Sequence, residues 1–215
     1  MEAYHKIDSI FDRDEKFKFI EGVWRTPEFE FLQNNTWLYT EKVRGTNIRI
    51  MCDQKSVCFG GRKAISSVPP LLEDKLTKMF PLERFRSFDS PVCLYGEGYG
   101  ARIQKSGGLY MADDVSFVLF DVLIGNGLTD PTKKDEIWWL KWPDIEIVAA
   151  QIGIKAVPII GDGTIWDAVK RVKDGIRSTW GDFEAEGLVI RPATALCDRN
   201  SKRILGKLKH KDFAE

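Results

Sequence analysis

What this chain lacks first of all is net charge, because its 32 lysines and arginines are balanced by 32 aspartates and glutamates. Without bulk positive charge, any affinity for nucleic acid must come from a local patch of cations. The balance counts against a passive nucleic-acid coat protein. It remains compatible with an enzyme that carries a basic groove.

Cysteine is also scarce, with four scattered residues and neither a C-x-x-C pair nor a Cys/His cluster, which argues against a zinc site. The first residues, MEAYHKIDSIFDRDEKFKF, lack the apolar core of a signal peptide. No apolar stretch approaches the length that spans a membrane. We therefore expect a soluble protein in a reducing compartment, with its thiols free.

Internal repeats and low-complexity segments are absent as well, and the segments that remain mix strand and helix patterns. Helices are expected over 69–80, over 164–176 with Thr164 as its cap, and as two short pieces of 134–152 separated by Pro143. Strands are expected over 37–52 (with a turn at Arg44-Gly45-Thr46), 56–59, 92–95, 115–124, 188–191 and 204–209.

Residues 1–35 are polar and mixed, and four apolar side chains are expected to anchor them to the body: Trp24, Phe29, Phe31 and Leu32. Because strands and helices follow no regular βα alternation, we predict the α+β class with mainly antiparallel sheets rather than a doubly wound fold.

Five short blocks carry the candidate chemistry, each with a charged or aromatic residue beside a strand-like run. In chain order they are EKVRGTN, LYGEGYG, FVLFDVL, EGLVIRP and KLKHK. Together they would build a sheet-lined pocket for a nucleoside triphosphate. Taken singly, each block has an ordinary explanation as core, turn or solvated charge, whereas their shared order, spacing and residue types favour a common site.

Lys42, in the first block, is the candidate nucleophile. A lysine amine attacks only when deprotonated, and its ordinary pKa is about 10.4, so burial or neighbouring cations must assist it. Gly45, three residues later, would allow a phosphate to approach the backbone closely.

The next two blocks suggest contacts to a nucleoside. Glu97 lies between two glycines after an apolar strand, where its carboxylate can accept a hydrogen bond from a ribose hydroxyl. Phe120 ends an apolar run, and an aromatic face can stack on a purine. Asp121 follows within the same apolar strand, so its carboxylate needs a partner.

The last two blocks supply charge. Glu186 begins a strand and is a suitable hard ligand for Mg²⁺ shared with phosphate oxygens, and Arg191 ends that strand. Lys207 and Lys209 alternate with Leu208, so both point to one face of a strand. Two cations on one face suit a triphosphate or its departing pyrophosphate.

In combination these blocks resemble the motifs of the covalent nucleotidyltransferase superfamily of ligases and capping enzymes, over about 41–209. The chain looks most like the phage RNA-repair ligases of the second type, which join RNA ends using ATP. EKVRGTN resembles the motif that carries the adenylated lysine, here Lys42. GGRK, YGEG, FD, EGLVIR and KLK resemble the motifs that follow it.

The resemblance implies roles for individual residues. Glu41 would read the adenine edge, Phe120 would stack on the base and Glu97 would hold the ribose. Arg62 would contact a phosphate and Asn47 would serve the sealing step. Glu186 would help to bind the catalytic metal, Mg²⁺ or Mn²⁺, and Arg191 stands where the family often carries a lysine.

The resemblance also implies an overall assignment. The whole of 1–215 would be one ligase-type adenylyltransferase domain, unrelated to ATP-grasp proteins, of antiparallel sheets flanked by helices. It would be an ATP-dependent ligase that joins 3′-hydroxyl and 5′-phosphate ends of RNA through a lysyl–AMP intermediate, in the cytoplasm or that of a phage-infected host.

Alternatives remain open at this point. One is a DNA ligase or a GTP-using capping enzyme, and another is a non-catalytic protein that binds nucleic-acid ends on the same fold. The sequence stops six residues after Lys209, where related ligases usually continue into a further domain. We therefore expect a minimal ligase, a truncated one, or a subunit whose partner supplies the missing part.

Overall fold

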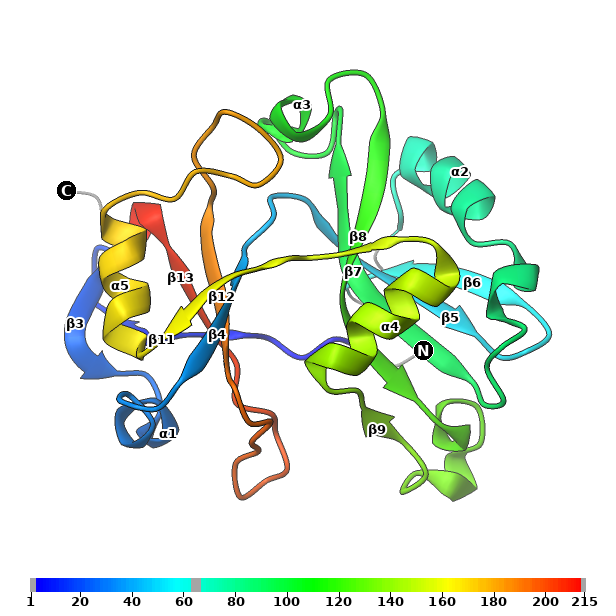
Figure 1. Ribbon diagram of the computed structural model, residues 1–215, viewed down its shortest axis with the longest axis horizontal. Helices are drawn as coiled ribbons and strands as arrows, with labels where there is room; N and C mark the ends of the chain where they lie inside the picture. Colours follow the sequence, from blue (N-terminus) through cyan, green and yellow to red (C-terminus); the bar gives the residue numbers. More distant parts are fainter. Residues whose placement is uncertain (1–2, 63–66, 214–215) are drawn as a thin grey trace. The chain divides into compact units, whose positions relative to one another are not determined.

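The computed structural model describes residues 3–62 and 67–213 (Figure 1). The chain forms two compact units that interleave along the sequence. Unit 1 comprises Met1–His5 and Arg44–Val157, and unit 2 comprises Lys6–Val43 and Pro158–Glu215. Each unit has its own main sheet, and each is described by itself.

Unit 2 is built on a five-stranded sheet in the order β1-β13-β12-β4-β11. The pairs are antiparallel except for β1 with β13. The strands are β1 (Asp8–Ser9), β4 (Trp37–Glu41), β11 (Ile159–Gly163), β12 (Gly187–Pro192) and β13 (Gly206–Lys209). A hairpin of β2 (Phe11–Arg13) and β3 (Phe19–Trp24), the short helix α1 (Pro27–Phe31) and the single-turn η4 (His210–Asp212) complete it.

Helix α5 (Ile165–Lys173) covers this sheet and contacts β12 and β13 (Figure 1). Thr164 caps it in a capping box, because its hydroxyl accepts from the Asp167 N–H while the Asp167 carboxylate accepts from the Thr164 N–H. Its buried face is spaced at helical periodicity and packs with Leu188, Ile190 and Leu208. The helix therefore defines which face of the sheet is core.

Unit 1 is built on a six-stranded sheet in the order β10-β8-β7-β5-β6, with β9 paired to β8. The strands are β5 (Thr46–Cys52), β6 (Val57–Gly61), β7 (Val92–Gly100), β8 (Val115–Ile124), β9 (Trp138–Trp139) and β10 (Lys155–Ala156). Helices α2 (Pro70–Met79) and α4 (Trp142–Ile152) contact β8 (Figure 1). The remaining helical segments are α3 (Gly107–Tyr110), η1 (Leu82–Phe85), η2 (Asn126–Leu128) and η3 (Pro131–Lys133).

Two glycines of β7 allow this unit to pack closely. A Cβ on Gly96 would lie 2.1 Å from the Phe117 ring, and a Cβ on Gly98 would lie 2.4 Å from Leu72 of α2. Both positions face the helix-covered side of the sheet. The side chain of Glu97, between them, therefore projects from the opposite face.

The α+β class with mainly antiparallel sheets is confirmed, as are most of the expected elements. Strand β8 and helix α2 lie where their patterns predict them, and β4 and β5 flank the expected break, although the two strands belong to different sheets. The expected anchors Trp24, Phe29 and Leu32 contribute to the core.

Two expectations were wrong. Segment 134–152 is not two helices split by Pro143 but strand β9 followed by the single helix α4, in which Pro143 occupies the first turn. Proline is tolerated there because the first-turn N–H groups have no partner within the helix. Phe31 is not an anchor, since it is 84% exposed. Among the described residues, no helix is long and apolar enough to span a membrane.

Candidate functional site

Three adjacent strands of unit 2 bring Lys42, Glu186 and Lys209 together. Lys42 directly follows β4, and its N–H donates to the Gly187 carbonyl (2.9 Å). The Glu186 carboxylate accepts from Lys42 Nζ through Oε2 (2.9 Å) and contacts Lys209 Nζ through Oε1 (2.6 Å). One carboxylate therefore holds two lysines from two different strands.

The electrostatics of this cluster favour an ionised Glu186. Burial alone would raise the pKa of its carboxyl, but the charge of Lys42 and the hydrogen bonds from Lys209 and Lys42 outweigh burial, so the pKa is lowered. All three side chains remain between 16% and 23% exposed. Glu186 is thus ionised, and the cluster is accessible to a ligand.

Lys207 lies on the same face of the sheet as this cluster. Leu208 is buried in the core under α5, so the neighbouring residues Lys207 and Lys209 project from the opposite face. Lys207 Nζ donates to the Ile7 carbonyl (2.7 Å). Arg191, between the buried Ile190 and Pro192, is partly exposed on that same face. The cations of the last two blocks therefore share one surface.

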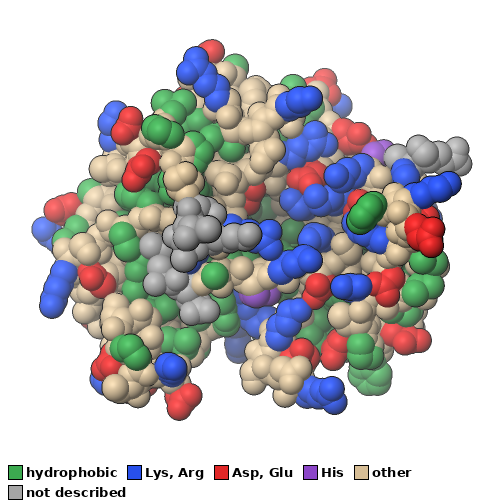
Figure 2. Space-filling view, turned by 180° about the vertical axis from the view of Figure 1, so that it is seen from behind, with side chains coloured by type: hydrophobic (Ala, Val, Ile, Leu, Met, Phe, Trp, Pro, Cys, Tyr) green, Lys and Arg blue, Asp and Glu red, His purple; other side chains and the backbone are tan. Residues whose placement is uncertain are grey.

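Positive side chains gather on one face of the molecule (Figure 2). The space-filling view in Figure 2 shows Lys and Arg side chains gathered on part of the face that it draws, despite the zero net charge of the chain. This local enrichment is the kind of feature that a neutral protein needs to attract phosphates.

Glu41 points to the other face, next to Leu188. It is 2% exposed, and its carboxylate is held by three donors from the segment before β12. Ser178 Oγ donates to Oε1 (2.7 Å), while the N–H and Oγ1 of Thr179 donate to Oε2 (2.8 and 2.9 Å). Sequence reasoning missed Ser178 and Thr179, because nothing local in the sequence links them to a residue about 137 positions away.

Unit 1 places a second group of the expected residues together. Asn47 on β5 and Glu97 on β7 are register partners, so their side chains share a face. The Oδ1 of Asn47 is buried without a hydrogen-bond partner in the described part of the chain. Arg62 follows Gly61, the partner of Ile48, and is exposed at the level of Asn47. Lys63, the next residue of that block, lies outside the described residues.

Phe120 lies at an irregularity of β8. Tyr95 pairs with Asp121 and Gly96 pairs with Leu119, so Phe120 is the extra residue of a β-bulge. Its ring lies edge-on to Tyr4, with centroids 5.0 Å apart. The partner that Asp121 was expected to need is also Tyr4, whose hydroxyl donates to Oδ2 (2.7 Å).

Gly45 has a structural explanation that the sequence did not reveal. A Cβ there would lie 2.2 Å from the Gly98 carbonyl oxygen and 2.8 Å from Cγ of Glu97. The close approach that requires glycine is therefore to β7 itself. It fixes the backbone after Arg44 against the strand that carries Glu97.

In the cluster with Lys42 and Lys209, Glu186 offers a hard carboxylate ligand for a divalent metal. Within the ranges that the structure describes, no group of three or more His, Cys, Asp or Glu side chains could hold an ion. Mg²⁺ is often bound by one or two carboxylates together with substrate phosphates. Glu186 fits that mode, provided that it exchanges one of its lysine contacts for the ion.

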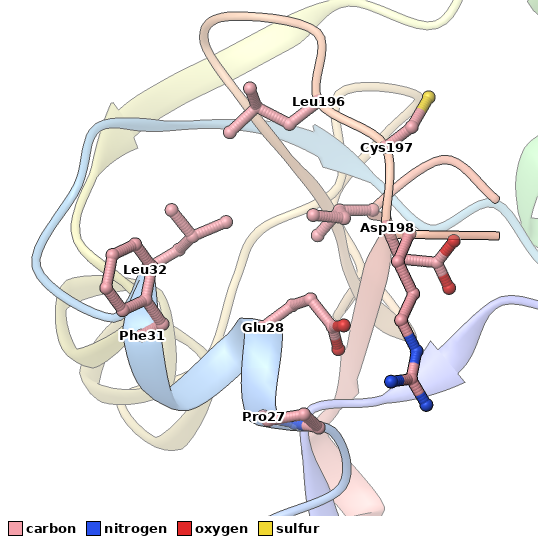
Figure 3. Close-up of a pocket in the computed structure, with 9 residues that line it drawn as sticks. Pro27, Glu28, Phe31, Leu32, Leu196, Cys197 and Asp198 are labelled. Carbon is pink, nitrogen blue, oxygen red and sulfur yellow. The ribbon is translucent and has the colours of Figure 1, made fainter. Parts of the chain in front are cut away.

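A cavity of about 400 Å³ lies elsewhere on unit 2 (Figure 3). It is lined by Pro27, Phe31 and Leu32 at α1 and by residues of the loop after β12, including Leu196 and Cys197. None of the residues of the five blocks lines it. It is therefore separate from the candidate site.

Lys42, Glu186 and Lys209 thus meet at the ends of three adjacent antiparallel strands. A family model described as RNA ligase matches residues 35–209. Because that match covers most of the chain, the protein belongs to the RNA ligase family. No curated protein sequence matches the chain closely enough to be counted.

Solved structures of Naegleria gruberi RNA ligase share this fold. A lysine-to-alanine variant with ATP and Mn superposes with a TM-score of 0.64 at 18% identity, covering 95% of this chain and 62% of that one. The same enzyme with pyrophosphate gives a TM-score of 0.63 at 18% identity, covering 96% and 61%. A glutamate-to-alanine variant with AMP and Mn gives 0.64 at 18%, covering 96% and 64%. The chain therefore spans about three-fifths of the length of these ligases.

Proposed function

We propose that this protein is an ATP-dependent polynucleotide ligase that joins RNA ends, of the kind found in phage RNA repair. The observation that carries the proposal is the cluster of Lys42, Glu186 and Lys209 in a chain of the RNA ligase family. ATP, AMP, pyrophosphate and Mn in the structures of the Naegleria enzyme support a nucleotide and a divalent metal as its ligands.

The first step is self-adenylation. The unprotonated Lys42 amine forms a bond to the α-phosphorus of ATP, the bond to the bridging oxygen breaks, and pyrophosphate leaves. The proton of the amine passes to solvent. Lys209 and Lys207, on the same face as Lys42, stabilise the negative charge that develops on the phosphates.

Two transfers follow. An oxygen of the RNA 5′-phosphate attacks the phosphorus of the lysyl–AMP, the P–N bond breaks, and the Lys42 amine regains a proton. A 3′-hydroxyl then attacks the activated 5′-phosphate, forming the phosphodiester and releasing AMP. Asn47, with its buried Oδ1, is our candidate for positioning the ends during sealing.

The residues of unit 1 would bind the nucleoside. Phe120 would stack on the base, Glu97 would accept from a ribose hydroxyl, and Arg62 would contact a phosphate. The β-bulge supports the role of Phe120, because bulges re-aim side chains next to active sites. When bound to Glu186, Mg²⁺ or Mn²⁺ would supply charge neutralisation of the phosphates.

The role proposed for Glu41 is mainly structural rather than a contact to the nucleotide. Its two oxygens already accept three hydrogen bonds, so about one of its acceptor positions is left for an adenine amino group. The same bonds tether the segment before β12 to the strand that ends at Lys42. We propose that Glu41 holds this strand end and contributes at most one contact to the base.

The proposal is tested by ligation of matched nicked duplexes. The purified chain with Mg²⁺ should seal an RNA nick with ATP but not with GTP, and should seal the corresponding DNA nick more slowly. Use of GTP would point instead to a capping enzyme, and faster sealing of DNA to a DNA ligase. Binding of RNA ends without sealing or adenylation would make the protein a non-catalytic end binder.

A further inference from the structure

Unit 2 has a second cavity, of about 220 Å³, whose lining is mainly polar. It lies at the edge of the sheet where β1 adjoins β13. The five blocks contribute only Lys207 to it. The other lining residues come from the N-terminal segment and from Arg25. The charged lining side chains are Lys6, Arg13, Arg25 and Lys207 against Asp8 and Asp12.

Both carboxylates of this cavity are already paired. Asp8 accepts from Lys202 Nζ (2.6 Å), and Asp12 accepts from Arg25 Nη1 (2.7 Å). Arg13, which lines the cavity, donates two hydrogen bonds to Asp212 (3.0 and 2.7 Å), a residue that does not line it. The acids therefore hold the cations in place, and the lining keeps an excess of positive charge.

Two of the cations retain donors for a ligand. The side chain of Lys6 is exposed and has no hydrogen bond or ion pair with any described residue. Arg25 uses only Nη1 for Asp12, which leaves its other nitrogens available. An ammonium and a guanidinium that converge on a small polar cavity match the oxygens of a phosphate group.

The cavity continues the surface that carries the nucleophile. Ser9, which also lines it, is the register partner of Lys207, so both lie on the face of Lys209. Lys207 and Lys209 are two residues apart on one strand, a separation of about 6.5 Å. That is close to the spacing of successive phosphates along an extended nucleic-acid strand.

We propose that this cavity is a phosphate-binding site, which we name the edge site, formed by Lys6, Arg25 and Lys207. It would hold a phosphate adjacent to the one that reacts at Lys42. The inference rests on the proposed function for the identity of the reacting phosphate. The edge-site phosphate belongs either to the RNA backbone or to the pyrophosphate part of ATP.

The test compares Lys6→Ala, Arg25→Ala and the double variant with wild type in the full chain. Lys170→Ala is the matched control, because Lys170 is an exposed cation of unit 2, paired with Asp174, that does not line the cavity. Binding of a 5′-phosphorylated single-stranded RNA is measured by fluorescence anisotropy at several salt concentrations. Binding of pyrophosphate is measured by titration calorimetry.

If the RNA backbone occupies the edge site, the slope of log K against log salt should flatten by about 0.7 in the variants, as expected for one lost phosphate contact to a single strand. Pyrophosphate binding should then be unchanged. If ATP supplies the phosphate, the variants should instead weaken pyrophosphate several-fold and leave the RNA slope as in wild type.

Variants that match Lys170→Ala in both assays would overturn the inference, as would a wild-type chain that binds neither probe. The outcome is separable from that of the proposed function. A chain that binds RNA through the edge site but forms no AMP adduct keeps the inference and contradicts the ligase assignment. A chain that forms the AMP adduct, but whose Lys6→Ala and Arg25→Ala variants bind both probes as wild type does, supports the ligase assignment and contradicts the edge site.

Discussion

Two carboxylates flank the candidate nucleophile on opposite faces of one sheet. Glu186 lies on the accessible face and is held by two lysines, whereas Glu41 lies on the core face and is held by hydroxyl and amide donors. The first arrangement balances charge and can rearrange around a ligand. The second is buried and fixed, so it serves to hold the strand end that leads to Lys42.

Glu186→Gln should lower the free energy of unfolding by about 1–3 kcal/mol at about pH 7, because charge-assisted hydrogen bonds to both lysines are lost. The folded-state pKa of Glu186 lies below its ordinary value of 4.5. Its contribution is therefore complete above about that pH and is lost as the pH falls through the folded pKa.

Urea unfolding of wild type and Glu186→Gln across the acid range tests this dependence. The difference between them should be constant above about pH 5.5 and should shrink below about 4.5. A difference that persists unchanged at lower pH would show that Glu186 acts through packing rather than charge.

Ser178→Ala should destabilise the chain by about 1–3 kcal/mol, because it removes a donor from the buried Glu41 carboxylate. Ser87→Ala, at an exposed serine, is the control and should change stability little. Thermal unfolding of both variants measures the difference. Equal melting temperatures would mean that the two donors of Thr179 suffice to hold Glu41.

At the scale of elements, the sequence predicts those helices and strands that depend on local features such as a cap residue, helical periodicity or a continuous apolar run. Helix α5 was predictable because Thr164 caps an amphipathic repeat, and β8 because it is a continuous apolar run. The strands of the first 35 residues were missed because they are short and depend on pairing with distant segments. For example, the two-residue β1 pairs with β13, about 198 positions along the chain.

The candidate site likewise contains residues that the sequence predicts and residues that it does not. The order and residue types of the five blocks predict a shared pocket, and the structure brings Lys42, Glu186 and Lys209 from three of the blocks together, but the ion pairs among them were not predicted. The donors to Glu41 could not be predicted, because a serine and a threonine in a loop carry no local signal for a distant carboxylate.

The glycines of β7 give a prediction at this scale. Gly96→Ala should destabilise unit 1 by about 1–3 kcal/mol, because the new methyl group would overlap the Phe117 ring. Gly108→Ala is the matched control, since nothing lies within 4 Å of its added Cβ. Chemical denaturation of both variants measures the effect. Similar stabilities would show that Phe117 can rotate away at little cost.

For the molecule as a whole, the two units divide the proposed chemistry between them. Unit 2 carries the proposed nucleophile with Lys207 and Lys209, and unit 1 carries the residues proposed for the nucleoside, for a phosphate contact and for sealing. One of the points at which the chain passes between the units lies between Val43 and Arg44, one residue after Lys42. The proposed covalent step and the proposed recognition steps are thus assigned to residues on two different sheets.

The central claim is that Lys42 is a nucleophile toward ATP, and the most direct measurement is the intact mass of the protein after incubation with ATP and Mg²⁺. Wild type and the control Lys170→Ala should gain the mass of one AMP, and peptide mapping should place it on Lys42. Lys42→Ala should gain none. A wild-type chain without the adduct, or an adduct that persists in Lys42→Ala, would contradict the account.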